Sequence, residues 1–179
     1  MSHTAMQLLI KDVRGQPEGP HLKWLADWEA NGPDGWTYWN IYNMPRPRMN
    51  LFEQAVSDCA RGPHGAVLGL YVETSDWGYI VGSGPTGIAA RLLINPDSAK
   101  ENSNGAWALD RLIVRAGTEA WDILAAEELA AWSEVAPRRA SADGVLGVIR
   151  QDWVFPEDGV KALRQLVGLP PPPIHPVGS

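Results

Sequence analysis

Short apolar runs separated by glycine and proline dominate the first half of the chain, and their length is typical of β-strands. The run Met6–Val13 ends at Arg14-Gly15, and the aromatic run Trp36–Met44 lies between Gly35 and Pro45. We therefore predict two strands. The aromatic side chains of the second strand alternate, so they are expected on both faces of a sheet.

Two other segments of this half show helical periodicity. Apolar residues of His21–Asn31 recur at spacings that place them on one helical face. The apolar stripe of Leu51–Arg61 includes Cys59, which we expect in the core. Asn50, with Glu53 three residues later, matches the capping box of a helix N-terminus. Two amphipathic helices are therefore predicted.

The middle of the chain contains three strand-like runs that turn residues separate. These runs are Ala66–Glu73, Trp77–Gly82 and Ile88–Asn95. Because the connections are short, we predict an antiparallel meander. Gly78 and Gly82 indicate that the middle strand lies at an edge or carries a β-bulge.

The last part of the chain is mostly helical in its pattern. Helices are predicted over Ala125–Val135 and Pro156–Gly168, which hold strong helix formers and a proline-led acidic first turn, respectively. Ser141–Trp153 has helical spacing but two internal glycines, so helix and strand both stay open. A polar surface loop is expected over Pro96–Gly105 and a strand over Leu109–Arg115.

Taken in order, these elements predict one α+β domain over residues 1–169, in which amphipathic helices cover an antiparallel β meander. Residues 170–179 are rich in proline and are expected to form an extended, solvated tail.

Composition and charge narrow the classes of function. The chain has 179 residues, and its 15 Lys and Arg against 21 Asp and Glu give a net charge of -6. Nucleic acid is not an expected partner, because no basic cluster could follow a phosphate backbone. No run reaches the ~20 apolar residues of a membrane helix, and the first residues lack the apolar core of a signal peptide. We therefore expect a cytoplasmic protein without membrane association.

The motifs of common catalytic and metal sites are missing. One cysteine excludes an internal disulfide and multi-cysteine metal sites, and the four histidines are scattered. Neither G-x-S-x-G nor H-E-x-x-H occurs. The segment Gly82–Gly87 leads from strand to strand, which indicates a hairpin loop and not a phosphate-binding loop. We expect no catalytic residue, no metal and no cofactor.

Tryptophan is unusually frequent, with nine residues against two phenylalanines. Four are expected in the core, because they lie on predicted helical stripes: Trp24, Trp28, Trp132 and Trp153. Trp77 follows the first turn of the meander, where an aromatic side chain is often exposed and can anchor a protein interface. Candidate partner-binding residues lie at this turn and at the exit of the first strand: Lys11, Asp12, Glu73, Asp76 and Trp77.

The segments Gly69–Asn95 and Trp153–Leu169 resemble small actinobacterial immunity proteins, which are encoded beside secreted polymorphic toxins. One group of these immunity proteins is similar to this chain in length and neutralises toxins that hydrolyse NAD. The resemblance implies a single α+β domain that binds a toxin and occludes its active site. It also implies no catalysis, no cofactor and an obligatory protein partner.

Three functional hypotheses follow. In the preferred one, the acidic chain caps the active site of a toxin, which is commonly electropositive when its substrate is a polyanion. The alternative is a small-ligand module or enzyme whose aromatic strand, Trp36–Tyr42, lines a pocket. A structural subunit of a larger assembly is a third possibility, and the oligomeric state stays open.

Overall fold

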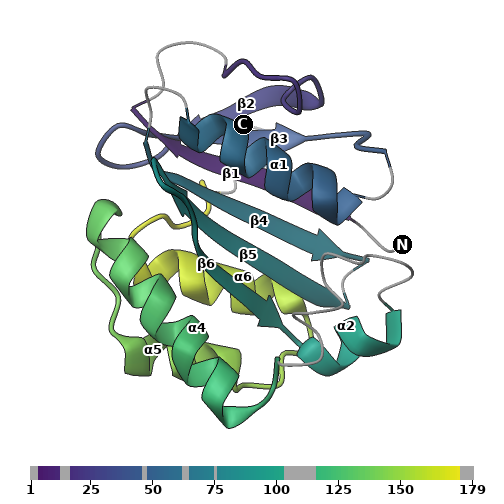
Figure 1. Cartoon of the computed structure of the whole chain (residues 1–179), viewed down its shortest axis with the longest axis vertical. Coiled ribbons are helices and arrows are strands. Elements are labelled where there is room, and N and C mark those ends of the chain that lie inside the picture. The colour runs from purple at the N-terminus through teal and green to yellow at the C-terminus, as the bar shows by residue number, and fades with distance from the viewer. Residues whose placement is uncertain are drawn as a thin grey trace, which may run out of the picture.

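The structure is a computed structural model that describes residues 4–12, 17–45, 48–61, 65–74, 76–102 and 116–173. These residues form an antiparallel sheet of six strands in the order β2-β3-β1-β4-β5-β6, as Figure 1 shows. The strands are β1 (Ala5–Lys11), β2 (Leu25–Asn31), β3 (Trp36–Ile41), β4 (Val67–Glu73), β5 (Trp77–Gly84) and β6 (Gly87–Ile94).

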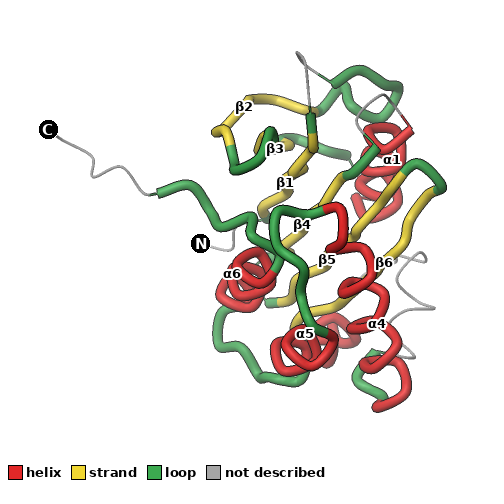
Figure 2. The backbone as a smooth tube through the Cα atoms, turned by 90° about the vertical axis from the view of Figure 1, so that its left-hand side faces the viewer, coloured by secondary structure: helices red, strands yellow, loops and turns green. Residues whose placement is uncertain are grey.

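Helices cover both faces of the sheet, so the domain has three layers (Figure 2). Helix α1 packs on one face, and α4, α5 and α6 pack on the other, while α2 follows β6 at one end of the sheet. The predicted α+β class is thus confirmed. The helices are α1 (Arg48–Arg61), α2 (Pro96–Asn102), α4 (Glu119–Trp132), α5 (Ala142–Ile149) and α6 (Pro156–Leu166), with a 3-10 turn at Ser133–Val135.

Each sheet face holds its own apolar core. On the α1 face, Phe52 lies against Tyr71 and Tyr79, with ring centroids 5.6 and 6.4 Å away. On the other face, Trp36 and Trp132 meet edge to face at 6.0 Å. Both faces are buried along β4, which explains its continuous apolar sequence.

Most predicted elements are confirmed. The meander is β4–β5–β6, and the loop from Ser83 to Gly87 is a hairpin turn. A register shift between Gly82 and Ser83 provides the expected bulge, although β5 lies inside the sheet and not at its edge. Ser141–Trp153 contains a helix, because the Ser141 hydroxyl accepts a hydrogen bond from the Gly144 N–H and caps α5.

Two predicted elements are wrong and a third begins elsewhere. Leu25–Asn31 is strand β2 and not a helix, because it pairs with β3 across two register shifts; tertiary pairing outweighs the helical spacing of the apolar residues. Pro96–Asn102 is helix α2 and not a loop, with proline at its first position. Asn50 lies inside α1, which begins at Arg48. The strand expected over Leu109–Arg115 lies outside the described residues.

Candidate functional site

The five predicted partner-binding residues do not form one surface. Strands β1 and β4 are antiparallel, so Lys11 N–H bonds to the Ala66 carbonyl at one end of the sheet, whereas Glu73 meets Thr4 at the other. A strand of this length separates the two ends by about 20 Å. Lys11 and Asp12 therefore cannot act together with Glu73, Asp76 and Trp77.

Trp77 is not the exposed anchor that its position beside a turn suggested. Only 2% of its surface is exposed, and its ring centroid lies 5.7 Å from that of Tyr71. Trp77 shares its strand face with Tyr79 and Val81, and α1 covers that face. A partner cannot contact this side chain while the core is intact, so this expectation is corrected.

The carboxylate of Glu73 is already bonded to other residues of the same chain. Its carboxylate accepts hydrogen bonds from the Tyr71 hydroxyl and from Thr4 Oγ1, and it lies 3.8 Å from Arg48 Nη1. Asp76, in contrast, is exposed, and its Oδ2 accepts a hydrogen bond from Thr74 Oγ1 at 2.9 Å. Of the three residues at this end of the sheet, Asp76 is the one that a partner can reach.

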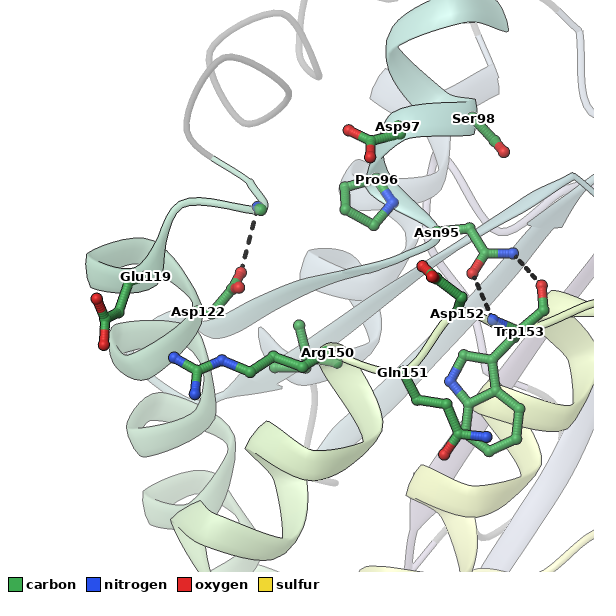
Figure 3. A pocket seen from close by; sticks show the side chains of 12 residues that line it. Asn95, Pro96, Asp97, Ser98, Glu119, Asp122, Arg150, Gln151, Asp152 and Trp153 are labelled. Atoms are coloured by element: carbon green, nitrogen blue, oxygen red, sulfur yellow. Dashed lines mark hydrogen bonds between the residues drawn. The ribbon is translucent and has the colours of Figure 1, made fainter.

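Asn95 joins the Asp76 turn to the loop between α5 and α6. Its Nδ2 donates to the carbonyls of Trp153 (2.8 Å) and Asp76 (3.3 Å), and its Oδ1 accepts from Trp153 N–H at 3.2 Å (Figure 3 shows the two bonds to Trp153). Asn95 has a left-handed backbone with φ +54°, a conformation that asparagine tolerates better than most residues. One amide therefore ties together three segments that are distant in the sequence.

The loop held by Asn95 exposes two large apolar side chains. Val154 is 85% exposed and Phe155 is 58% exposed, whereas the preceding Trp153 is half-buried and donates from Nε1 to the Val148 carbonyl at 3.0 Å. Trp153 also packs on Gly159, where an added Cβ would lie 2.9 Å from the indole. The exposed pair thus stands on a fixed base.

A cavity of about 710 Å³ opens beside this loop, between the end of β6, the first turns of α2 and α4, and the end of α5 (Figure 3). Four of its charged lining residues are acidic and one is basic: Asp97, Glu119, Asp122, Asp152 and Arg150. Lys100, next to the cavity, is paired with Asp97 at 3.1 Å. Concave sites lined by one sign of charge focus the field and attract ligands of the opposite sign.

Asp122 is the most buried of these carboxylates, with 7% of its surface exposed. Its Oδ1 accepts a hydrogen bond from Gly117 N–H at 3.2 Å. Burial raises the pKa of Asp122, and the hydrogen bond and the positive charge of Arg150 offset this only in part. A positively charged group bound in the cavity would therefore stabilise the ionised carboxylate of Asp122.

We name the exposed rim of this region the α5–α6 surface. It comprises Asp76, Asp97, Glu119, Asp152, Val154 and Phe155. Sequence analysis missed Val154 and Phe155 as site residues. The sequence did contain a signal. The apolar run between Asp152 and Pro156-Glu157-Asp158 belongs to neither a helical nor a strand-like apolar pattern, so no buried face is predicted for it.

The histidine and the cysteine in the described parts of the chain are, respectively, paired with a carboxylate and buried. His21 is the only histidine described there, and its Nδ1 lies 2.8 Å from Asp58 Oδ2. The neighbouring Cys59 is 2% exposed, and burial raises the pKa of its thiol to about 12. Its expected burial is confirmed, and the thiol stays protonated at neutral pH. No group of three or more potential metal ligands occurs among the described residues.

The aromatic strand does not line an open pocket. Trp36 and Tyr38 are 1% exposed and fill one core, while Trp39 is 9% exposed and belongs to the other. Tyr42, beyond the end of β3, is exposed. Of the four tryptophans expected in the core, Trp132 is buried and Trp24 and Trp153 are half-buried, but Trp28 is 52% exposed on β2, because that segment is an edge strand.

Comparisons with protein-family models, with curated proteins and with solved structures found no match for this chain. Among the described helices, none is long and apolar enough to cross a membrane.

Proposed function

We propose that this chain is a non-catalytic immunity protein that neutralises a toxin by covering its active site with the α5–α6 surface. The observation that supports this proposal best is the exposure of Val154 and Phe155 beside an acidic cavity. Exposed aromatic side chains on a rigid base are typical anchors of protein interfaces, since they bury a large area at a low entropic cost.

Charge supports the choice of partner. The exposed carboxylates Asp97, Glu119 and Asp152 line the cavity beside the loop that carries the apolar tip, and Asn95 joins the Asp76 turn to the same loop. The chain as a whole carries a net charge of -6. An enzyme that binds a polyanionic substrate such as NAD needs a positively charged active site, to which this surface is complementary. Inhibition would then be steric, with electrostatic attraction increasing the rate of association.

The described side chains agree with a binding role and do not support the alternative in which the aromatic strand lines a ligand pocket. The aromatic strand that was to line a ligand pocket is packed into two cores, and Cys59 and His21 are not arranged as a nucleophile with its base. A binding protein requires only a stable scaffold and a complementary surface.

The test needs a toxin domain, which the proposal expects to be encoded next to this chain, and it measures both binding and residual toxin activity. Phe155→Ala is compared with Tyr42→Ala, because the two aromatic side chains are similarly exposed, at 58% and 53%. Removing an interface anchor costs about 2 kcal/mol or more, so Phe155→Ala should raise Kd at least about 30-fold. Tyr42→Ala should leave Kd unchanged.

Charge reversal tests the electrostatic part. Asp152→Lys should slow association, and the loss should shrink toward ~0.5 M salt, where screening is strong. An interface beside the C-terminal end of β3, on the β2 side of the sheet, would instead make Tyr42→Ala the damaging variant. The proposal is overturned if no neighbouring toxin domain binds the chain, or if Phe155→Ala binds as tightly as the wild type.

A further inference from the structure

Arg164, on α6, is a buried cation that forms no ion pair with the described residues. It is 4% exposed, and it takes part in none of the ion pairs found there. Its guanidinium donates to three neutral acceptors: Nε to the Leu169 carbonyl (2.8 Å), Nη1 to Gln7 Oε1 (3.1 Å) and Nη2 to the Pro170 carbonyl (3.3 Å). Because a guanidinium stays protonated in proteins, this positive charge is buried without a direct counter-charge.

The environment of Arg164 offsets that charge only in part. One side of the guanidinium faces the ring of Tyr38, with Cζ 4.8 Å from the ring centroid. Glu29 is one amide away, because Gln7 Nε2 donates to Glu29 Oε2 at 2.6 Å while Gln7 Oε1 accepts from Arg164. Burial still lowers the pKa of Arg164. An anion in contact with the guanidinium would remove this penalty.

Arg164 also borders a cavity of about 180 Å³ between α6 and the sheet. Apolar side chains of Leu70, Val72 and Val160 form much of its wall. Glu157 and Lys161 also line it, so the three charged residues of the lining have a formal net charge of +1. The volume equals about six waters at ~30 Å³ each, too small for a drug-sized ligand and sufficient for a short carboxylic acid.

We propose that this cavity, the Arg164 pocket, binds a small carboxylate that carries a short apolar group. The carboxylate would pair with Arg164, since Nη1 and Nη2 each have a second N–H besides the bonds given above and the guanidinium fork fits two carboxylate oxygens. The apolar group would contact Leu70, Val72 and Val160. The pocket shares no residue with the α5–α6 surface, so its ligand does not depend on the proposed function.

The probe is isovalerate, titrated into the full chain by calorimetry and followed by amide chemical shifts. Its uncharged counterpart, 3-methylbutanamide, should bind at least tenfold more weakly, because it cannot compensate the guanidinium charge. N-acetyl-leucine distinguishes the source of the carboxylate. Tighter binding of N-acetyl-leucine indicates a peptide C-terminus, and tighter binding of isovalerate indicates a free acid.

Two variants keep the test independent of folding defects at Arg164. Ala5 lines the pocket and is exposed, so Ala5→Phe should fill the cavity and weaken isovalerate binding at least tenfold. Ala89, also exposed but on β6, provides the control Ala89→Phe, which should bind as the wild type does. The proposal is overturned if isovalerate shows no saturable binding up to about 10 mM, if the amide binds equally well, or if Ala5→Phe has no effect.

Discussion

Replacing Asn95 should destabilise the chain and release the loop that exposes Phe155. Asn95→Gly keeps the left-handed backbone accessible but removes three hydrogen bonds, two to Trp153 and one to Asp76. Each such bond contributes about 0.5–1.5 kcal/mol, and the longest bond, to Asp76, counts least. We therefore expect a loss of about 2 kcal/mol. In a chain of this length that lowers Tm by about 4–8 °C. Asn95→Ala should lose about 1–2 kcal/mol more, because alanine disfavours positive φ.

Urea unfolding gives the free energy, and hydrogen exchange at the Trp153 amide reports the local effect, since that N–H loses its acceptor. Asn43→Gly is the matched control. Asn43 also has positive φ, at +57°, but its side chain is exposed and forms no hydrogen bond with the described residues. This control should change stability by less than about 0.5 kcal/mol. Unchanged stability in Asn95→Gly, together with unchanged exchange at Trp153, would refute the role assigned to Asn95.

Two further predictions concern titratable groups. Cys59 should resist a thiol reagent at pH 8, because its pKa of about 12 leaves a thiolate fraction of only about one in 10⁴; labelling of the folded protein as fast as that of the urea-unfolded protein would contradict the helix packing. Burial raises the pKa of Asp122 in the folded state above its value in the unfolded state, so the folded chain loses stability as the pH rises through the folded-state pKa. Asp122→Asn removes this ionisation and should therefore stabilise the chain at pH 7. The variant should lose this advantage below about pH 4, where Asp122 is protonated in both states. Urea midpoints of both proteins at pH 3.5 and pH 7 measure this difference, and an equal or lower midpoint for Asp122→Asn at pH 7 would contradict it.

The sequence predicts the strands better than it predicts their surroundings. The apolar run of β4 and the alternation in β3 identify strands whatever covers them. Which segments pack beside these strands depends on contacts between residues that are distant in the sequence. Strand β2 is an example. Its apolar spacing suits a helix, but β3 offers an unpaired edge that only an extended segment can satisfy. The residues of Leu25–Asn31 alone do not indicate that an unpaired strand edge is available to them.

The error at Trp77 has a different origin. Proximity to a turn suggested exposure, yet the two-residue period of the strand already placed Trp77 on the same face as Tyr79 and Val81. Giving that period more weight than the turn would have predicted burial. Lys11 and Glu73 could likewise be separated only once the antiparallel register of β1 and β4 was known.

The location of the α5–α6 surface follows from features that do not favour stability. Buried carboxylates and exposed aromatics both cost folding free energy, and natural sequences retain such conflicts mainly at functional sites. Asp122 is the only carboxylate residue buried in the described parts of the chain, and it borders the cavity next to the exposed Phe155. Trp28 and Tyr42 are exposed too, and Gln7 links the buried Arg164 to Glu29, the neighbour of Trp28. Arg164 is a cation, however, so it does not complement a positively charged active site as the carboxylate of Asp122 does. The acidic cavity beside an exposed aromatic side chain therefore favours the loop that carries Phe155 as the binding surface.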